Sequence, residues 1–121
     1  MGEIATSNRQ ITMYYDAGSE FGKKTRAYAE TEGFEVLAID VVKEPLTGTQ
    51  LLELADRLGI HISELVDQQN PAYAYKFNPH DLSSEDWVKM LRKNPEIMRG
   101  PIVIHGDKIA LIETISDIKN F

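Results

Sequence analysis

The spacing of apolar residues changes twice in the first third of the chain, and each change marks a predicted boundary. Residues 11–15 are mostly apolar, β-branched or aromatic, which predicts a strand. The next four residues predict a turn that ends at Ser19, a residue type that caps helices. From residue 20 to 32 the apolar positions follow helical spacing, and Gly33 suits the end of that helix. Residues 34–42 predict a second, largely buried strand.

The middle of the chain carries the pattern of three helices. Thr47 and Gln50 have the spacing of a capping box, and the helix behind them is predicted to end at Gly59. Its predicted apolar face consists of Leu51, Leu52, Leu54, Ala55 and Leu58. Ser63 is predicted to cap a short second helix. Ser83 with Asp86 is predicted to cap a third helix, with the apolar residues Trp87, Val88, Met90 and Leu91.

The last part of the chain predicts a β-hairpin and a short helix. Residues 102–104 and 109–112 are apolar and flank a turn at Gly106 and Asp107, and Ser116 is predicted to cap the helix. The order β-α-β, helices, then β-β-α is typical of an α/β, thioredoxin-like fold. Its mixed four-stranded sheet would carry a helical insertion between strands 2 and 3. We expect residues 1–121 to form a single domain, with residues 1–9 as a disordered N-terminus.

Charge and targeting patterns narrow the choice of partners. The chain has 13 basic and 19 acidic residues, a formal net charge of −6. An acidic chain repels phosphate groups, so binding of nucleic acid or of an anionic membrane through bulk charge is not expected. Residues 1–10 are polar and lack the apolar stretch of a signal peptide. We therefore expect a cytoplasmic protein, whose oligomeric state the sequence leaves open.

The chain contains no cysteine. This excludes disulfides, thiolate metal ligands, thiol nucleophiles and redox dithiols within the chain. The three histidines are far apart and lack metal-ligand spacing, so no metal site is predicted.

Motifs at both ends of the chain resemble one family. Residues 11–15 (Ile-Thr-Met-Tyr-Tyr), with the turn and helix behind them, resemble the opening of the glutaredoxin-linked arsenate reductases, which include the Spx-type regulators. Residues 99–104 (Arg-Gly-Pro-Ile-Val-Ile) resemble that family's Arg-Pro-Ile-Val strand entry. Residues 51–60 and 115–118 fit as well, so the likeness covers about residues 10–119. The resemblance implies the thioredoxin-like fold and, for the family, glutaredoxin-dependent arsenate reduction.

The positions at which this family carries its chemistry are changed in this chain. By the resemblance, the nucleophilic cysteine falls on Ser19 and the arginine four residues later on Lys23. The three other arginines of the arsenate site fall near Asp67, on Gly100 and near Glu113. Arg99 stands one place before Gly100. The resemblance therefore implies a site that has lost its thiol and most of its cationic clamp.

Ser19 has two chemical interpretations besides a nucleophile. A serine hydroxyl titrates far above a thiol and needs an adjacent base to attack, and no histidine is near in sequence. The simplest role is a helix N-cap. The helix N-terminus with Lys23 and Lys24 could also attract an oxyanion, which Glu20 would oppose.

Pro101 and a tyrosine-bearing loop are further candidates. The resemblance implies a cis peptide bond before Pro101, which faces the first loop and shapes a docking site for a substrate backbone. Gly100 then leaves a slot without a side chain. Tyr73, Tyr75 and Phe77 alternate in a loop that either binds a partner or packs onto the domain.

The function predicted from these residues is a catalytically silent, arsenate-reductase-like binding module. Its candidate binding residues are Gly18, Ser19, Lys23, Arg99, Gly100 and Pro101. Its partner would be an unidentified protein or peptide, and no cofactor is expected. The alternative is a glutathione- or thiol-dependent enzyme in which Ser19 stabilises a bound thiolate. Retained arsenate reductase-family oxidoreductase activity is a third reading, which the missing cysteine opposes.

Overall fold

The computed structural model describes residues 10–67 and 82–121. The chain divides into two compact units. The sheet unit comprises Met1–Asp40 and Gly100–Phe121, and the helical unit comprises Val41–Arg99. The single domain expected from the sequence stays a prediction, and the expected disorder of residues 1–9 lies outside the described residues.

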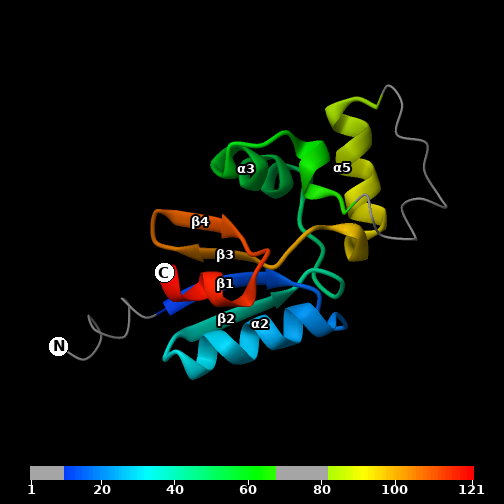
Figure 1. Cartoon of the computed structure of the whole chain (residues 1–121). Coiled ribbons are helices and arrows are strands. Elements are labelled where there is room, and N and C mark those ends of the chain that lie inside the picture. The colour runs from blue at the N-terminus through cyan, green and yellow to red at the C-terminus, as the bar shows by residue number, and fades with distance from the viewer. Residues whose placement is uncertain (1–9, 68–81) are drawn as a thin grey trace. The chain divides into compact units, whose positions relative to one another are not determined.

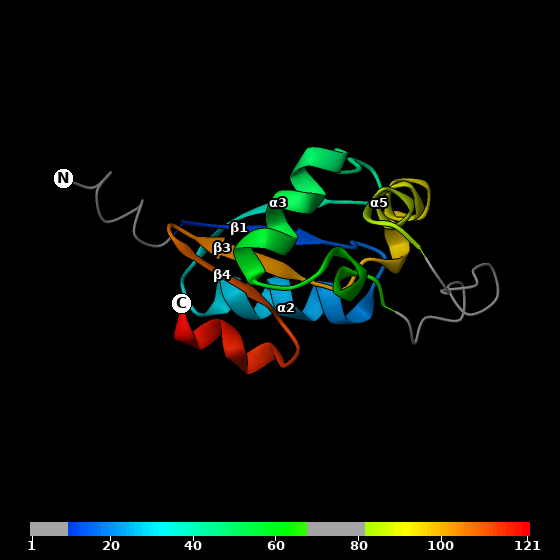
Figure 2. The same ribbon diagram turned by 90° about the horizontal axis from the view of Figure 1, so that it is seen from above.

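The sheet unit contains the predicted mixed four-stranded sheet. Its strands are β1 (Gln10–Tyr15), β2 (Glu35–Asp40), β3 (Ile102–His105) and β4 (Lys108–Leu111), in the order β2-β1-β3-β4. β1 pairs with β2 in parallel and with β3 antiparallel, and β3 pairs antiparallel with β4. Helix α2 (Glu20–Thr31) links the parallel strands, and the 3₁₀ helix η3 (Ile115–Asn120) ends the chain. Figures 1 and 2 show α2 and η3 on the same face of the sheet. The predicted α/β, thioredoxin-like fold is thereby confirmed.

The core of the sheet unit lies between that face and its two helices. Its buried residues are Ile11, Met13, Tyr15, Ala29, Phe34, Val103, Ile112 and Ile118. Close packing of α2 depends on Gly22, because a Cβ there would lie 2.7 Å from the carbonyl oxygen of Asp16. Thr25 and Ala29 are the other buried residues of this helix.

In its described part, residues 41–67 and 82–99, the helical unit contains two α-helices and two 3₁₀ helices. They are α3 (Gly48–Leu58), η1 (Ile62–Leu65), α5 (Ser84–Lys93) and η2 (Pro95–Ile97). The predicted capping boxes are present in both α-helices, through Thr47 with Gln50 and Ser83 with Asp86. Trp87 is 5% exposed and belongs to the buried core.

Two predicted helix caps were wrong. The short helix η1 begins after His61, whose ring accepts the Ser63 amide, and not after Ser63 itself. The terminal helix begins after Thr114 and not after Ser116, and the Thr114 amide donates to Asp117 at 3.2 Å. In both cases an acidic residue three positions after the true cap completes a capping box, with Glu64 and Asp117 in that role.

Two predictions of burial were also wrong. β2 spans six residues rather than nine. Leu37 pairs with Thr12, so its side chain lies on the face of the sheet opposite the buried Ile11 and Met13, and it is 54% exposed. Leu52 of α3 is 46% exposed because the buried residues of that helix are Leu51, Leu54 and Ala55.

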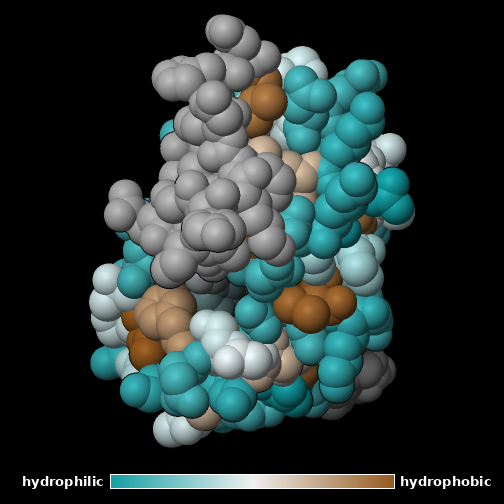
Figure 3. Space-filling model, turned by 90° about the vertical axis from the view of Figure 1, so that its right-hand side faces the viewer, coloured by the Kyte–Doolittle hydropathy of each residue, from teal (hydrophilic) through white to brown (hydrophobic). Residues whose placement is uncertain are grey.

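The large hydrophobic residues that are exposed in the described part of the chain are Leu37, Val42 and Leu52. The face in Figure 3 is mainly hydrophilic, with its hydrophobic residues in separate patches. Among the described residues, no helix combines the length and hydropathy needed to cross a bilayer.

Candidate functional site

The sheet brings the first loop, defined as residues 16–19, to the same end of the sheet as Gly100 and Pro101. The loop leaves the carboxyl end of β1 and leads into α2. β3 runs antiparallel to β1, with Tyr14 opposite Ile102, so the residues before β3 lie beside the end of β1. Four of the predicted site residues, Gly18, Ser19, Gly100 and Pro101, therefore come from this one end of the sheet unit.

Ser19 is the N-cap of α2. Its backbone is extended (φ −84°, ψ 133°), and its Oγ accepts a hydrogen bond from the Gly22 amide at 3.2 Å. Its own amide donates to the carbonyl oxygen of Asp16 at 3.0 Å. Among the described residues, no carboxylate or imidazole is hydrogen-bonded to this hydroxyl. Without a base, the geometry supplies the capping role and not an activated nucleophile.

The other amides of the first loop are also used within the molecule. Gly18 donates to Asp16 Oδ1 at 2.8 Å, and Ala17 donates to Asp40 Oδ1 at 3.4 Å. Glu20 is the exposed first residue of α2. These three carboxylates surround amides that would otherwise face an oxyanion. They offset the positive end of the helix dipole, so the loop is a poor anion site.

The basic residues near this loop differ in their surroundings. Lys23 and Lys24 are exposed on α2. Arg26, one turn further, donates from Nη1 to the Tyr15 hydroxyl at 2.9 Å, and this hydrogen bond raises the pKa of Arg26. The Arg26 guanidinium also lies 5.9 Å from the centre of the Tyr15 ring. It therefore ties α2 to β1 instead of facing the loop.

Pro101 follows a cis peptide bond with Gly100, as the resemblance implied. Pro101 is buried, and its carbonyl oxygen accepts the Ile112 amide at 2.8 Å. Gly100 is half-buried, and a Cβ there would lie 3.5 Å from both the Tyr14 carbonyl oxygen and the Ile102 nitrogen. This is ordinary contact, so packing within the sheet unit does not require a glycine.

The remaining residues at or beside family positions are Arg99, Asp67 and Glu113. Arg99 is in the helical unit, where Nη1 donates to the Glu64 carbonyl oxygen at 3.1 Å. Asp67 belongs to the same unit, and its amide donates to Ile97 at 2.7 Å. Glu113 is exposed just after β4. The participation of Arg99 in a shared site stays a prediction.

Sequence reasoning missed the acidic residues that hold the first loop. Asp16 begins a turn, and its bond to an amide two residues later is a common aspartate turn that the sequence could have indicated. Asp40 is 23 residues from Ala17, so only the parallel pairing of β1 and β2 brings it there.

The described histidine of the sheet unit, His105, packs against aromatic residues of the same unit. His105 packs edge-on to Phe34, with ring centres 5.9 Å apart, and Nδ1 lies 3.0 Å from the Phe121 backbone oxygen. Among the described residues, no group of three histidine, aspartate or glutamate side chains could hold a metal ion. Tyr73, Tyr75 and Phe77 lie outside the described residues.

Solved structures with the same fold include arsenate reductases, the family that the sequence motifs resemble. A candidate arsenate reductase from Yersinia pestis superposes with a TM-score of 0.82 at 18% identity, covering 92% of this chain and 99% of that one. An arsenate reductase from Vibrio cholerae gives 0.81 at 15%, covering 93% and 97%. An arsenate reductase-related protein from Brucella melitensis gives 0.73 at 15%, covering 93% of both chains.

At these identities the matches show the fold. They confirm the structural resemblance to arsenate reductases, for a chain without cysteine. No protein-family model matches the sequence, and neither does any curated protein.

Proposed function

We propose that this chain is a thiol-independent binding protein on an arsenate-reductase scaffold. In this proposal the first loop and the Gly100–Pro101 segment bind a protein or peptide partner. The observation that carries the proposal is the state of Ser19. Its hydroxyl caps α2 through Gly22, at the position that the resemblance assigns to the nucleophile.

The electrostatics of the first loop support the absence of reductase chemistry. A thiolate at a helix N-terminus is stabilised by loop amides and nearby cations. Here the amides of Ala17 and Gly18 donate to Asp40 and Asp16. Arsenate is an anion and would meet these carboxylates where a reductase needs positive charge. The same loop presents exposed Gly18 and half-buried Ser19 to a less charged partner.

An amide chemical-shift titration separates this proposal from its alternatives. The uniformly ¹⁵N-labelled chain is titrated with glutathione, arsenate and sulfate, and the amides of residues 18–21 are followed. We expect no saturable shift with any of the three. A saturable glutathione response that Ser19→Ala abolishes would favour the thiolate-stabilising alternative, because the Ser19 hydroxyl still has its own proton to donate.

An activity measurement tests the same point independently. We expect no arsenate reduction by the purified chain with glutaredoxin and glutathione. Turnover that Ser19→Ala leaves intact would show a contaminant, so the variant is the control. Turnover lost in that variant contradicts the proposal.

The positive arm uses photo-crosslinking from the proposed surface. A photoreactive residue replaces Lys23 in one variant and the exposed Glu53 of α3 in a matched control. A partner crosslinked from position 23 alone supports the proposal, whereas equal capture from both positions contradicts it.

A further inference from the structure

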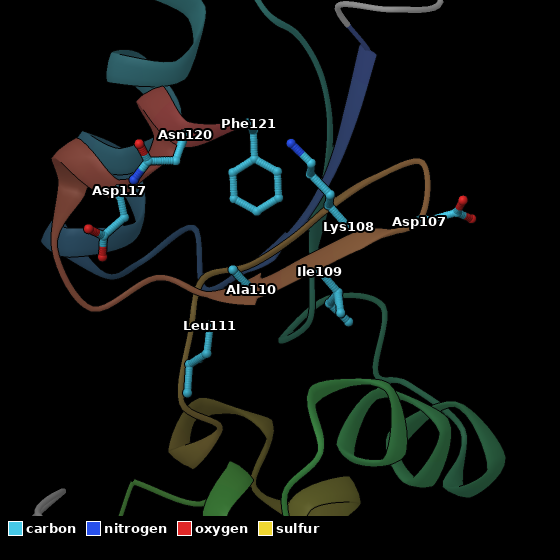
Figure 4. A pocket seen from close by; sticks show the side chains of 8 residues that line it. All are labelled: Asp107, Lys108, Ile109, Ala110, Leu111, Asp117, Asn120 and Phe121. Carbon is cyan, nitrogen blue, oxygen red and sulfur yellow. The ribbon is translucent and has the colours of Figure 1, made fainter.

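The free edge of β4 faces an open groove. β4 is the last strand in the sheet order, so one side of it pairs with β3, and among residues 10–67 and 82–121 no strand pairs with its other side. The groove has a volume of about 500 Å³ and is lined by β4, the preceding Asp107 and three residues of the terminal segment: Asp117, Asn120 and Phe121. Figure 4 shows these residues around the strand.

The register shows which backbone groups of β4 face outward. Ile112 donates to Pro101, and hydrogen-bonded pairs alternate along an antiparallel ladder, so Ala110 and Lys108 also bond to β3. Ile109 and Leu111 then direct their N–H and C=O groups away from β3. Among the described residues, neither has a hydrogen-bond partner on that side. Unpaired edge groups of this kind are templates for another strand.

The charges around the groove indicate which kind of added strand would bind there. Asp107 and Asp117 line it, and the exposed Glu113 follows β4. Lys108 is the lining cation. Lys119 is hydrogen-bonded to Tyr28, and this bond, together with the charge of Glu32, raises the pKa of Lys119. The rim is therefore acidic on balance and complements a basic segment.

The side chains of β4 add a second preference. Ile109 and Leu111 point away from Phe121, whereas Ala110 points toward it (Figure 4). Residues of an added strand that lie opposite Ile109 and Leu111 would share their apolar face. The intervening residues would lie on the face of Asp117 and Asn120, where basic side chains find acceptors.

We propose that the β4 edge binds an extended basic peptide segment of another protein by strand addition, with apolar and basic residues alternating along it. This surface is separate from the first loop and goes beyond the function proposed above. A second copy of the chain fits less well. The antiparallel self-pairing that joins Ile109 of each copy to Leu111 of the other is centred on Ala110 and places Asp107 of each chain opposite Glu113 of the other.

The test titrates the ¹⁵N-labelled full chain with a capped seven-residue peptide of alternating lysine and valine. We expect saturable shifts at Ile109, Leu111 and Asp117, with residues 18–21 unchanged. The same peptide with glutamate in place of lysine is expected to bind at least about tenfold more weakly, since two or more exposed charge pairs change sign. Equal affinity for the two peptides, or no saturable shift at β4, overturns the proposal.

Variants make the test specific to the edge. Leu111→Pro removes an outward amide and is expected to abolish the β4 shifts. Asp107→Lys, which leaves the backbone unchanged, is expected to weaken binding about threefold or more. Glu35→Lys makes the same charge change on the opposite edge strand and is expected to leave the affinity unchanged. Equal weakening by both lysine variants contradicts the proposal, as does a dimer seen by sedimentation that Leu111→Pro dissociates.

Discussion

The first loop and the β4 edge use their backbone amides in opposite ways. In the first loop, Ala17, Gly18 and Ser19 each donate to an acceptor of the same unit. At the β4 edge, Ile109 and Leu111 direct theirs outward. A loop whose donors are already bonded gains little by meeting an anion, whereas an edge strand gains hydrogen bonds from a new strand. The comparison teaches that binding capacity follows unused backbone groups more closely than it follows the position of a family motif.

The largest expected effect comes from proline substitutions in β4, which distinguish amides that bond to β3 from amides that point outward. Ala110→Pro removes a ladder hydrogen bond and leaves an acceptor of β3 without its donor, so it is expected to lower the free energy of unfolding by about 1–3 kcal/mol. Leu111→Pro removes an amide that does not bond to β3, so its cost should be clearly smaller. Urea unfolding followed by circular dichroism measures both. Equal losses for the two variants would show that the outward assignment is wrong.

A second variant tests how tightly α2 is held against the first loop. Gly22→Ala places a Cβ 2.7 Å from the Asp16 backbone, which must shift. Overpacking destabilises the variant, whereas the better helix propensity of alanine stabilises it. We expect a net loss of about 1–2 kcal/mol in the free energy of unfolding. Gly18→Ala is the matched control, because its Cβ meets the flexible Asp16 side chain at 3.3 Å. A control that destabilises as much as Gly22→Ala contradicts this explanation.

The smallest effect compares the cap of α2 with that of α5 across pH. Ser19→Ala removes a hydroxyl cap and should cost about 1 kcal/mol at both pH 7 and pH 3. At α5, the Ser83 backbone amide, followed by the Ser83 hydroxyl, lowers the pKa of Asp86. The stabilisation from Asp86 is therefore present above its unfolded pKa and is lost as pH falls through the folded value.

The measurement is the free energy of unfolding of Ser19→Ala and Ser83→Ala, each against the parent chain, at the two pH values. The loss in Ser83→Ala should shrink at pH 3 while that in Ser19→Ala stays constant. A shrinking loss at Ser19 would mean that a carboxylate takes part in its cap.

Most of the fold was predictable because local chemistry marks its boundaries. Ser19 and Thr47 precede helices that the structure contains, and Gly59 ends one of them with φ 73°. The wrong caps at Ser63 and Ser116 arose because two polar residues compete at each helix start. The acid three residues after His61 and Thr114 decides between them.

The candidate site was less predictable because long-range contacts decide its chemistry. Capping by Ser19 is local and was foreseen. The bond from Ala17 to Asp40 and the bond from Arg99 to Glu64 join residues 23 and 35 positions apart. No pattern along the chain indicates such partners. Their effect is to consume a loop amide and a guanidinium that the family resemblance would have left for an oxyanion.

Gly100 and Gly22 differ in the room that they leave for a side chain. A Cβ at Gly100 would meet only ordinary contacts within the sheet unit. At Gly22, by contrast, a Cβ would lie 2.7 Å from the Asp16 carbonyl oxygen, so a side chain there forces the backbone to shift. The surface beside the first loop can therefore be redesigned by substitution at Gly100, whereas position 22 is fixed by the contact between α2 and the loop.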